Sequence, residues 1–414
     1  MELDLKKSDL QTNYKKSPRV DKLKVLSPVG TDTGGCGLFR IRQPFAKMNS
    51  NNLAACIVMD AQSPADLIAS NVKEADVIVV RPRAEKFAFQ LKEWEKDPKL
   101  NEAYGLSKKV YVFDHDDNTF EVSPLNPHYG NIGVKEVDII DHDGIHGPKG
   151  GVHHLWKRGM EGFDIDKNQL FMESLERILR ESDLVTTTTP FIADYFRQFN
   201  DNVKVLPNCI DFNDWKPLNL VKDDWIRICF QGGSSHFADW ETCKEPLKEI
   251  FAKYPNVKLV TAGSYYKGNI KDFPQDRWEH SGWVDVSAHP YRMAGLNIDI
   301  ALIPLEDNLF NRCKSEIKFS EFASLKVPSL VQNIPPYSLV CKDGDNALCY
   351  NNSRELVEKL SLLIENEQLR RKIGENAYKW VKANRDADKE AHLWADAYRE
   401  TYETRNEKNK THKK

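Results

Sequence analysis

Basic side chains cluster where the segment 301–331 passes from a polar stretch into a predicted helix. The segment opens with the strand-like run ALIPL, and the apolar spacing after it predicts a helix that begins near Ser315. The first turn of a helix has free backbone N–H groups and the positive end of the helix dipole, so it attracts anions. Arg312, Lys314 and Lys318 lie around this start, which makes it a candidate diphosphate site. The residues that we assign to it are Lys314, Ser315, Glu316, Ile317 and Lys318.

A carboxylate follows on the same predicted helix. Glu321 lies three residues beyond Lys318, and residues at this spacing share one face of a helix. A carboxylate can accept two hydroxyl hydrogen bonds, as a ribose diol would offer. A cation for the diphosphate and a carboxylate for the ribose would together hold a nucleotide. The alternative is a surface helix with solvated charges, because such spacing is a weak signal by itself.

Two glycine-rich turns follow predicted strands, GTDTGGCG at 30–37 and GGSSH at 232–236. Glycine lets the backbone approach a ligand without interference from a Cβ atom. We predict that both turns contribute to binding, the first toward the donor phosphates or the acceptor and the second toward phosphate. The candidates are Gly34, Gly35, Gly232, Gly233 and Ser234, with His236 at the rim. The alternative is plain strand-to-helix geometry, with an Asp cap in the second turn.

Three carboxylates and an imidazole follow the strand-like run at 108–114, in the order Asp114, His115, Asp116 and Asp117. α/β folds concentrate ligand sites at the carboxyl ends of their strands. We therefore predict catalytic proton handling by His115 or Asp116, and acceptor binding by Asp117. A metal site and ordinary turn chemistry are the alternatives.

Four histidines, at 142, 146, 153 and 154, fall in the glycine-rich stretch 141–162. Their spacing lacks the ligand pattern of a zinc site. We predict one long irregular loop over a cleft, with His153 and His154 on the acceptor side and no bound metal.

Strand-like and helix-like runs alternate along the chain, which predicts an α/β protein with mostly parallel sheets. The 414 residues exceed what one core can hold, so two lobes are expected. The predicted strands lie in 23–29, 54–60, 76–82, 108–114, 183–189, 225–231, 257–263, 298–305 and 328–333. The predicted divisions are a flexible N-terminal extension 1–22, a first Rossmann-like lobe 23–205, a linker 206–219, a second lobe 220–385, a helix 386–404 that packs back on the first lobe, and a frayed basic tail 405–414.

Composition excludes several classes of protein. With a formal net charge of -3, the protein has no overall positive charge that would attract nucleic acid. No apolar run approaches the ~20 residues needed to cross a bilayer, and the N-terminus lacks the apolar core of a signal peptide. Eight cysteines without a CxxC pair indicate reduced, packed thiols. We expect a cytoplasmic protein.

In the order of these motifs the chain resembles the retaining, two-lobed (GT-B) glycosyltransferases of family 4, the glycosyl transferases group 1. The segment 301–331 resembles their nucleotide-sugar-binding loop, and 182–215, with its Pro-Asn-x-Ile-Asp, resembles their passage into the second lobe. The resemblance extends over residues 23–400. One departure is Cys313, where many members have a first Glu that contacts the donor sugar. The pattern N-x-x-K-S-x-x-K-x-x-E, formed by Asn311, Lys314, Ser315, Lys318 and Glu321, fits a branch without that Glu.

The resemblance implies two Rossmann-like lobes facing each other across a cleft, the second lobe holding the donor. It implies transfer of a sugar from a nucleoside-diphosphate sugar, preferentially a UDP-sugar, to a hydroxyl acceptor with retention of configuration. Trp283 and Val284 would then border the nucleotide base, and neither a metal ion nor a cofactor would be needed. The acceptor classes that remain open are a glycan, a lipid-linked sugar, a protein, a small molecule and a modified DNA base. The alternatives are a sugar-nucleotide epimerase of the same fold and a non-catalytic binding protein.

Overall fold

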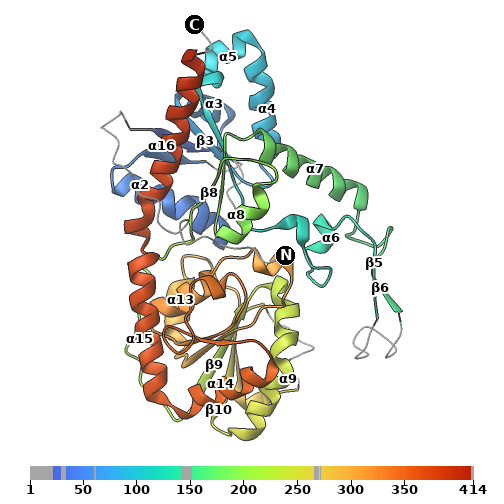
Figure 1. The fold of residues 1–414 in the computed structure, drawn as a ribbon, viewed down its shortest axis with the longest axis vertical. Coiled ribbons are helices and arrows are strands. Elements are labelled where there is room, and N and C mark those ends of the chain that lie inside the picture. Colours follow the sequence, from blue (N-terminus) through green and yellow to red (C-terminus); the bar gives the residue numbers. More distant parts are fainter. Residues whose placement is uncertain are drawn as a thin grey trace. The chain divides into compact units, whose positions relative to one another are not determined.

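The structure is a computed structural model, and it describes residues 22–28, 34–59, 62–140, 152–264, 270 and 272–411. The chain forms two compact units, each with one six-stranded sheet (Figure 1). Unit 1 contains the chain up to Asp116, residues Arg177–Pro207 and the chain from Ala387 onward. Unit 2 contains Asp117–Glu176 and Asn208–Asp386. Chain order therefore does not separate the units, because a stretch of the first half belongs with the second.

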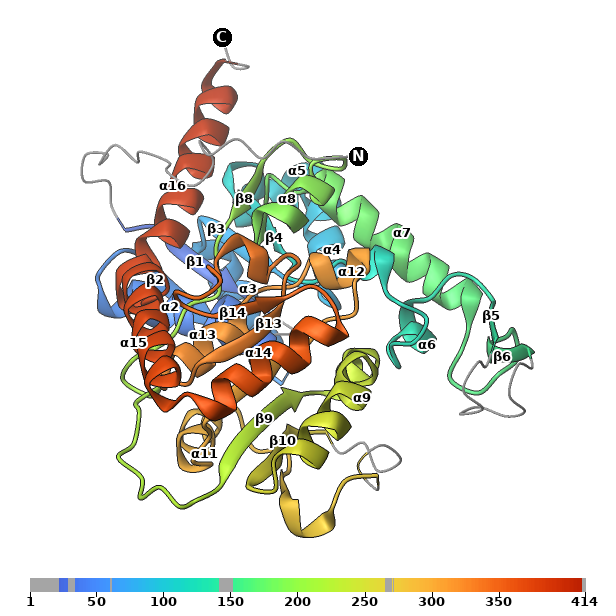
Figure 2. The same cartoon turned by 60° about the horizontal axis from the view of Figure 1, so that its bottom comes forward.

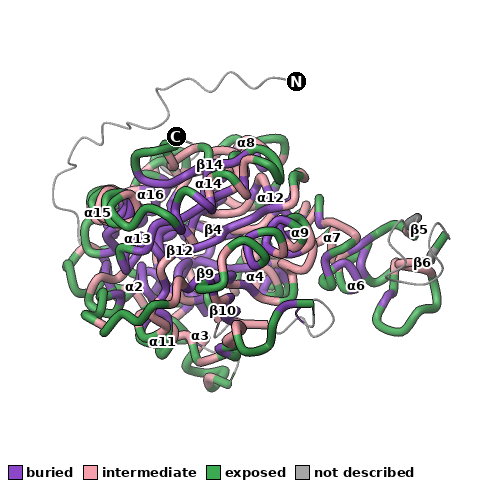
Figure 3. The backbone as a smooth tube through the Cα atoms, turned by 90° about the horizontal axis from the view of Figure 1, so that it is seen from below, coloured by how far each residue is buried: buried purple, intermediate pink, exposed green. Residues whose placement is uncertain are grey.

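Unit 1 is built on a parallel sheet with the strand order β2-β1-β3-β4-β7-β8. The strands are β1 (Lys24–Ser27), β2 (Ala55–Val58), β3 (Val77–Val80), β4 (Val110–Asp114), β7 (Leu184–Thr187) and β8 (Val203–Val205). Its helices are α1 (Gly35–Gly37), a π-helical turn (Leu38–Arg42), α2 (Gln43–Ser50), α3 (Ala65–Glu74), α4 (Glu85–Lys96), α5 (Pro98–Tyr104), the end of α7 (Ile165–Glu181), α8 (Pro190–Phe196) and α16 (Ala387–Thr411). Every residue of β3 and β4 is buried, as the purple tube of β4 shows in Figure 3. Their continuous apolar runs reflect a sheet that is covered on both faces.

Helix α16 is joined to the rest of unit 1 by polar contacts along its length. It contacts α2, where Lys47 Nζ lies 3.1 Å from Asp388. Near its end, Arg405 donates to Glu95 at 3.0 Å and also pairs with Asp183. The expectation of a frayed tail from residue 405 is therefore wrong up to Thr411, because α16 continues to that residue and Arg405 binds two half-buried carboxylates.

Unit 2 is built on a second parallel sheet, with the order β11-β10-β9-β12-β13-β14. The strands are β9 (Ile226–Gly232), β10 (Val257–Gly263), β11 (Trp278–Ser281), β12 (Ile300–Ile303), β13 (Ser329–Gln332) and β14 (Leu348–Tyr350). Its helices are α6 (Tyr129–Ile132), the start of α7, a 3-10 turn (Ser234–His236), α9 (Phe237–Lys253), α11 (His289–Gly295), α12 (Leu309–Arg312), α13 (Ile317–Ser324), α14 (Ser353–Glu365) and α15 (Glu367–Asn384). The strand order is that of a Rossmann sheet, whose direction of winding reverses between β9 and β12. The predicted α/β class with two Rossmann-like sheets is confirmed.

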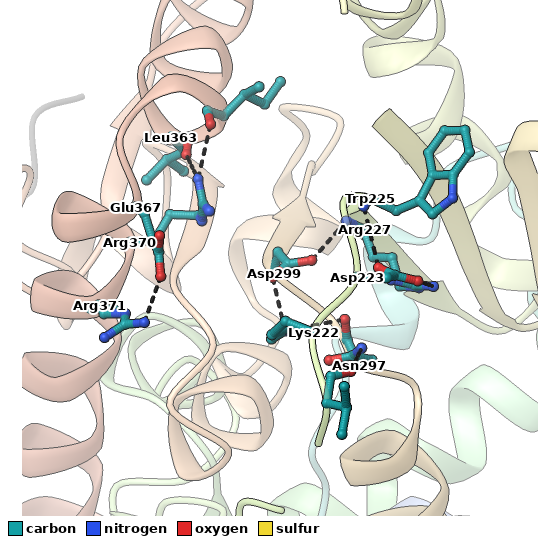
Figure 4. A network of polar contacts seen from close by, with 12 residues as sticks. Lys222, Asp223, Trp225, Arg227, Asn297, Asp299, Leu363, Glu367, Arg370 and Arg371 are labelled. Carbon is teal, nitrogen blue, oxygen red and sulfur yellow. Dashed lines mark hydrogen bonds and ion pairs between the residues drawn. The ribbon is translucent and has the colours of Figure 1, made fainter. Parts of the chain in front are cut away.

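A polar network holds the amino ends of β9 and β12 together in unit 2 (Figure 4). Arg227 donates two hydrogen bonds to Asp223, at 2.6 and 2.8 Å. Asp299 accepts from the backbone N–H of Arg227 at 2.9 Å and from Lys222 at 2.8 Å. Because the network lies at the amino end of these strands, it leaves the opposite, carboxyl edge of the sheet to carry the candidate site.

A separate antiparallel hairpin belongs to unit 2 and consists of β5 (Val137–Ile140) and β6 (Val152–Trp156). Figure 2 shows it at the start of α7, apart from the sheet of its own unit. Its base packs in a small apolar cluster with Tyr129, Phe163 and Phe310. The prediction of one irregular loop over 141–162 is thus wrong for β6, whose β-branched and aromatic residues pair with β5. Residues 141–151 lie outside the described part of the chain.

Two findings concern membrane-spanning helices and the state of the cysteines. No helix in the described ranges has both the length and the apolar content to cross a bilayer. All eight cysteines are free thiols, and most are buried as predicted, but Cys36 is exposed.

Candidate functional site

The carboxyl ends of β9 and β12 meet at the reversal point of the sheet in unit 2, where α/β proteins bind ligands. The turn after β9 is tightly packed. A Cβ atom on Gly232 would lie 2.9 Å from the imidazole of His236, so glycine is needed here to fit that ring. Ser234 is exposed, and Gly233 has open space around it except for Trp283, 3.9 Å from where its Cβ would be. Gly232 thus serves the packing of His236 as well as any ligand.

Asp239, in the first turn of α9, joins three segments around the candidate site. Its side chain is 1% exposed and accepts hydrogen bonds from Glu306 N at 2.7 Å and Asn311 Nδ2 at 2.9 Å. His236 Nδ1 lies 2.6 Å from its other oxygen. Burial by itself would raise the pKa of Asp239, but the hydrogen bond and charge of His236 and the charge of Lys318 lower it. Sequence reasoning treated this residue only as a helix cap; its spacing of three from His236 was the available signal.

Lys318 differs from the neighbouring cations Arg312 and Lys314 because no carboxylate of the described chain pairs with it. It lies in the first turn of α13, where no side chain caps the free N–H groups. It is half-buried, and it forms no hydrogen bond or ion pair with any residue that the structure describes. Burial and the charge of Lys314 lower the pKa of Lys318 to about 8, although Asp239 opposes the shift. An anionic ligand would relieve this unfavourable position.

The other charged residues predicted at the helix start have partners within the protein. Arg312 donates to Asp307 at 2.6 and 2.8 Å. Lys314 lies 3.6 Å from Asp117 and over the ring of Phe310.

Two further residues of the predicted set have structural partners. Ser315 Oγ accepts from Asn208 at 3.0 Å, and the buried carboxylate of Glu316 accepts from Arg385 at 2.6 Å. Ile317 opens α13 and can offer only its backbone N–H. The structure thus brings these residues together around one helix start. Several of their side chains, however, are bound to other residues of the protein.

Glu321, on the next turn of α13, is held by two residues that sequence reasoning missed. Its side chain is 5% exposed, accepts from Gln231 Nε2 at 2.9 Å and lies 3.7 Å from His289 Nε2. Burial lowers the pKa of His289, but the hydrogen bond and charge of Glu321 raise it above its ordinary value. Gln231 is the penultimate residue of β9 and His289 is the first residue of α11, so both lie at the same edge of the sheet. The chain gave no local signal for either contact.

Cys313 does not supply the chemistry of the absent Glu. Its thiol is fully buried and accepts from Asn118 Nδ2 at 3.4 Å. Burial raises the pKa of Cys313 to about 12, so the thiol stays protonated at neutral pH.

The aromatic residue predicted near the base is a surface residue. Trp283 is 74% exposed and so does not belong to the core, and Val284 is half-buried.

In unit 1, buried ion pairs occupy the carboxyl end of β4. Arg40 donates to Asp114 at 2.7 Å through Nη2, and Thr186 donates to the same carboxylate at 2.8 Å. Arg81 pairs with Asp116, and its Nε lies 3.7 Å from Asp114. Burial would raise the pKa of Asp116, but Arg81 and Arg40 lower it to about 2. Asp116 is therefore ionised at neutral pH.

His115 is 2% exposed, and its ring stacks on Phe196 with centroids 5.4 Å apart. Gly34 accepts from Leu38 N at 3.0 Å and from Arg42 at 3.2 Å, and Gly35 has open space around it. The predicted roles of these residues stay predictions. Asp117, which follows Asp116 directly, belongs to unit 2 and faces Lys314.

The histidine-rich segment is only partly described. His154 Nδ1 lies 2.6 Å from Asp138, across the hairpin. His153 is in β6, but its side chain falls outside the described residues, as do His142 and His146 entirely. Among the side chains that are described, no group of three His, Cys, Asp or Glu could hold a metal ion.

The chain is similar to one known protein family and to several solved structures. Residues 243–396 match a family of glycosyl transferase-like proteins. No curated protein sequence matches the chain significantly. Among solved structures, sucrose-phosphate synthase from Thermosynechococcus elongatus is 14% identical, with a TM-score of 0.60 over 92% of this chain and 100% of that one.

Two further structures have the same fold. HepE from Anabaena, in complex with UDP and glucose, is 13% identical, with a TM-score of 0.55 over 90% of this chain and 98% of that one. A glycosyltransferase from Rickettsia africae is 12% identical, with a TM-score of 0.55 over 92% and 99%. The fold is that of the two-lobed (GT-B) glycosyltransferases. Together with the family match over residues 243–396, this fold confirms the predicted resemblance to the group 1 glycosyl transferases.

Proposed function

We propose that this protein transfers a sugar from a nucleoside-diphosphate sugar, preferentially a UDP-sugar, to a hydroxyl acceptor. The observation that carries the proposal is Lys318, a half-buried cation at an uncapped helix start, one turn before the fixed carboxylate of Glu321. Their spacing suits a diphosphate and a ribose. Similar structures containing UDP and UDP-glucose support the choice of nucleotide.

In the proposed reaction, the bond between the anomeric carbon and the diphosphate breaks while the acceptor oxygen bonds to the same face of that carbon. Lys318 and the first N–H groups of α13 stabilise the charge that develops on the departing diphosphate. The proton of the acceptor hydroxyl passes to a phosphate oxygen, and configuration is retained. No protein nucleophile, metal ion or cofactor takes part. The acceptor would lie toward the residues His115, Asp116, Asp117, His153 and His154, and the reaction would take place in the cytoplasm.

The reaction can be tested with radiolabelled UDP-sugars and a lysate of the host as a source of acceptors. We expect release of UDP and labelling of a product only when acceptor is present, and the same rate in EDTA. Mass spectrometry of the product identifies the acceptor. Conversion of the UDP-sugar to an epimer without acceptor would show an epimerase, and binding without turnover would show a binding protein. Loss of activity in EDTA would show that a metal takes part.

The affinity for UDP should depend on pH through Lys318. The protonated amine binds the diphosphate, so affinity is retained below the pKa of about 8 and falls as pH rises through it. Between pH 7 and 9 we expect a loss of up to about tenfold by calorimetry, while a phosphate with a second pKa of about 6 stays ionised. Lys318→Arg serves as the matched control, because arginine keeps its charge over this range. An equal decline in that variant would assign the pH dependence to another group.

A further inference from the structure

The imidazole of His236 has one defined tautomer. Asp239 accepts hydrogen bonds through Oδ1 from Glu306 N and Asn311 Nδ2, and its Oδ2 lies 2.6 Å from His236 Nδ1. An ionised carboxylate only accepts hydrogen bonds, so the proton of this contact belongs to Nδ1. In a neutral imidazole the other nitrogen is then an acceptor. His236 therefore offers the lone pair of Nε2.

The surroundings of His236 keep the ring neutral and fixed. Burial and the charges of Lys318 and Lys314 lower the pKa of His236 to about 4, and Asp239 opposes this shift only in part. The ring packs against Gly232, as the 2.9 Å approach to a Cβ built there shows. Nε2 itself has no hydrogen-bond partner within the described chain. A neutral, oriented acceptor thus lies close to the cation assigned to the diphosphate.

We propose that His236 is a specificity-determining residue, whose Nε2 accepts a hydrogen bond from a hydroxyl of the transferred sugar. This inference rests on the proposed function. The ligand group at Nε2 must be a hydrogen-bond donor, which excludes ionised phosphate oxygens. The ribose hydroxyls are assigned to Glu321, so the hydroxyls of the sugar remain as donors beside the diphosphate. His236 would supply the sugar contact that the buried thiol of Cys313 cannot make.

The test compares the affinity for UDP with that for a UDP-sugar, by calorimetry in wild type and in His236→Ala. UDP-glucose, UDP-galactose and UDP-N-acetylglucosamine are titrated first, and the one that binds wild type most tightly is used. We expect His236→Ala to bind this UDP-sugar roughly five- to tenfold more weakly, as for the loss of one hydrogen bond, and UDP within twofold of wild type. His392→Ala, an exposed histidine on α16, is the matched control.

A second variant changes the tautomer without removing the ring. In Asp239→Asn, the amide oxygen can still accept from Glu306 N and Asn311, while the amide N–H₂ faces His236. Nδ1 must then accept, and the ring proton moves to Nε2, which becomes a donor. We expect the nitrogen chemical shifts of the His236 ring to report this exchange by NMR. The affinity for the UDP-sugar should fall relative to that for UDP, as in His236→Ala.

The outcomes separate this inference from the proposed function. An equal loss of UDP and UDP-sugar in His236→Ala would place the imidazole on the phosphate and overturn the inference. Unchanged affinity for both ligands, or a proton on Nε2 in the wild-type protein, would also overturn it. Failure of the wild-type protein to bind UDP would instead contradict the proposed function itself.

Discussion

Lys318→Ala lowers kcat by roughly 10²–10³, the scale expected for the loss of one preorganised group that stabilises charge in the transition state. The effect is on kcat because negative charge on the diphosphate grows as the sugar–phosphate bond breaks. Lys318 has no carboxylate of the described chain in ion-pair contact, so its full charge is available to the ligand. The measurement is steady-state turnover of the UDP-sugar under saturating acceptor.

Glu321→Ala provides the contrast that makes this prediction specific. Its carboxylate would hold the ribose equally in the ground and transition states, so its loss chiefly raises the KM for the donor. Arg371→Ala, which removes an exposed cation on α15, should leave both constants unchanged. If Lys318→Ala kept its kcat and Glu321→Ala kept its donor KM, α13 would be a solvated surface helix and the donor assignment would be wrong.

Asp114→Ala destabilises unit 1 by about 3–5 kcal/mol, because it leaves the guanidinium of Arg40 buried without its main counter-charge. Arg40 is 0% exposed and donates to Asp114 through both Nε and Nη2. For a unit of this size, such a loss lowers the unfolding temperature by about 6–20 °C. Differential scanning calorimetry measures it as a downward shift of the transition in which unit 1 unfolds.

Two controls test the cause of that destabilisation. The double variant Arg40→Met/Asp114→Leu removes both charges and should recover most of the lost stability, since a packed apolar pair often replaces a buried ion pair well. Glu74→Gln removes an exposed pair with Lys24 and should cause no measurable shift. A melting temperature in Asp114→Ala equal to that of wild type would show that the buried pair contributes nothing to the stability of unit 1.

The elements of the two sheets were largely predictable from the chain alone. Strands β3, β4 and β10 fall within the predicted segments and β9 exceeds its segment by one residue, because a β-branched apolar run buried on both faces is a local property of the sequence. The helix start before Lys318 was predictable from the apolar spacing that follows it, which is also a local property of the sequence. β11, β14 and the hairpin of β5 and β6 were missed, since each is short and depends on a strand brought to it by the fold.

The sequence by itself therefore determined the class of fold, the alternation of its elements and the presence of a cationic helix start near Glu321. Only the tertiary structure decided which charges stay available for a ligand. Lys314 and Glu316 are engaged by Asp117 and Arg385, and Asp239 binds a side chain 72 residues away. The charge state and orientation of a side chain depend on its burial and its neighbours. Those neighbours come from distant parts of the chain, where no local pattern records them.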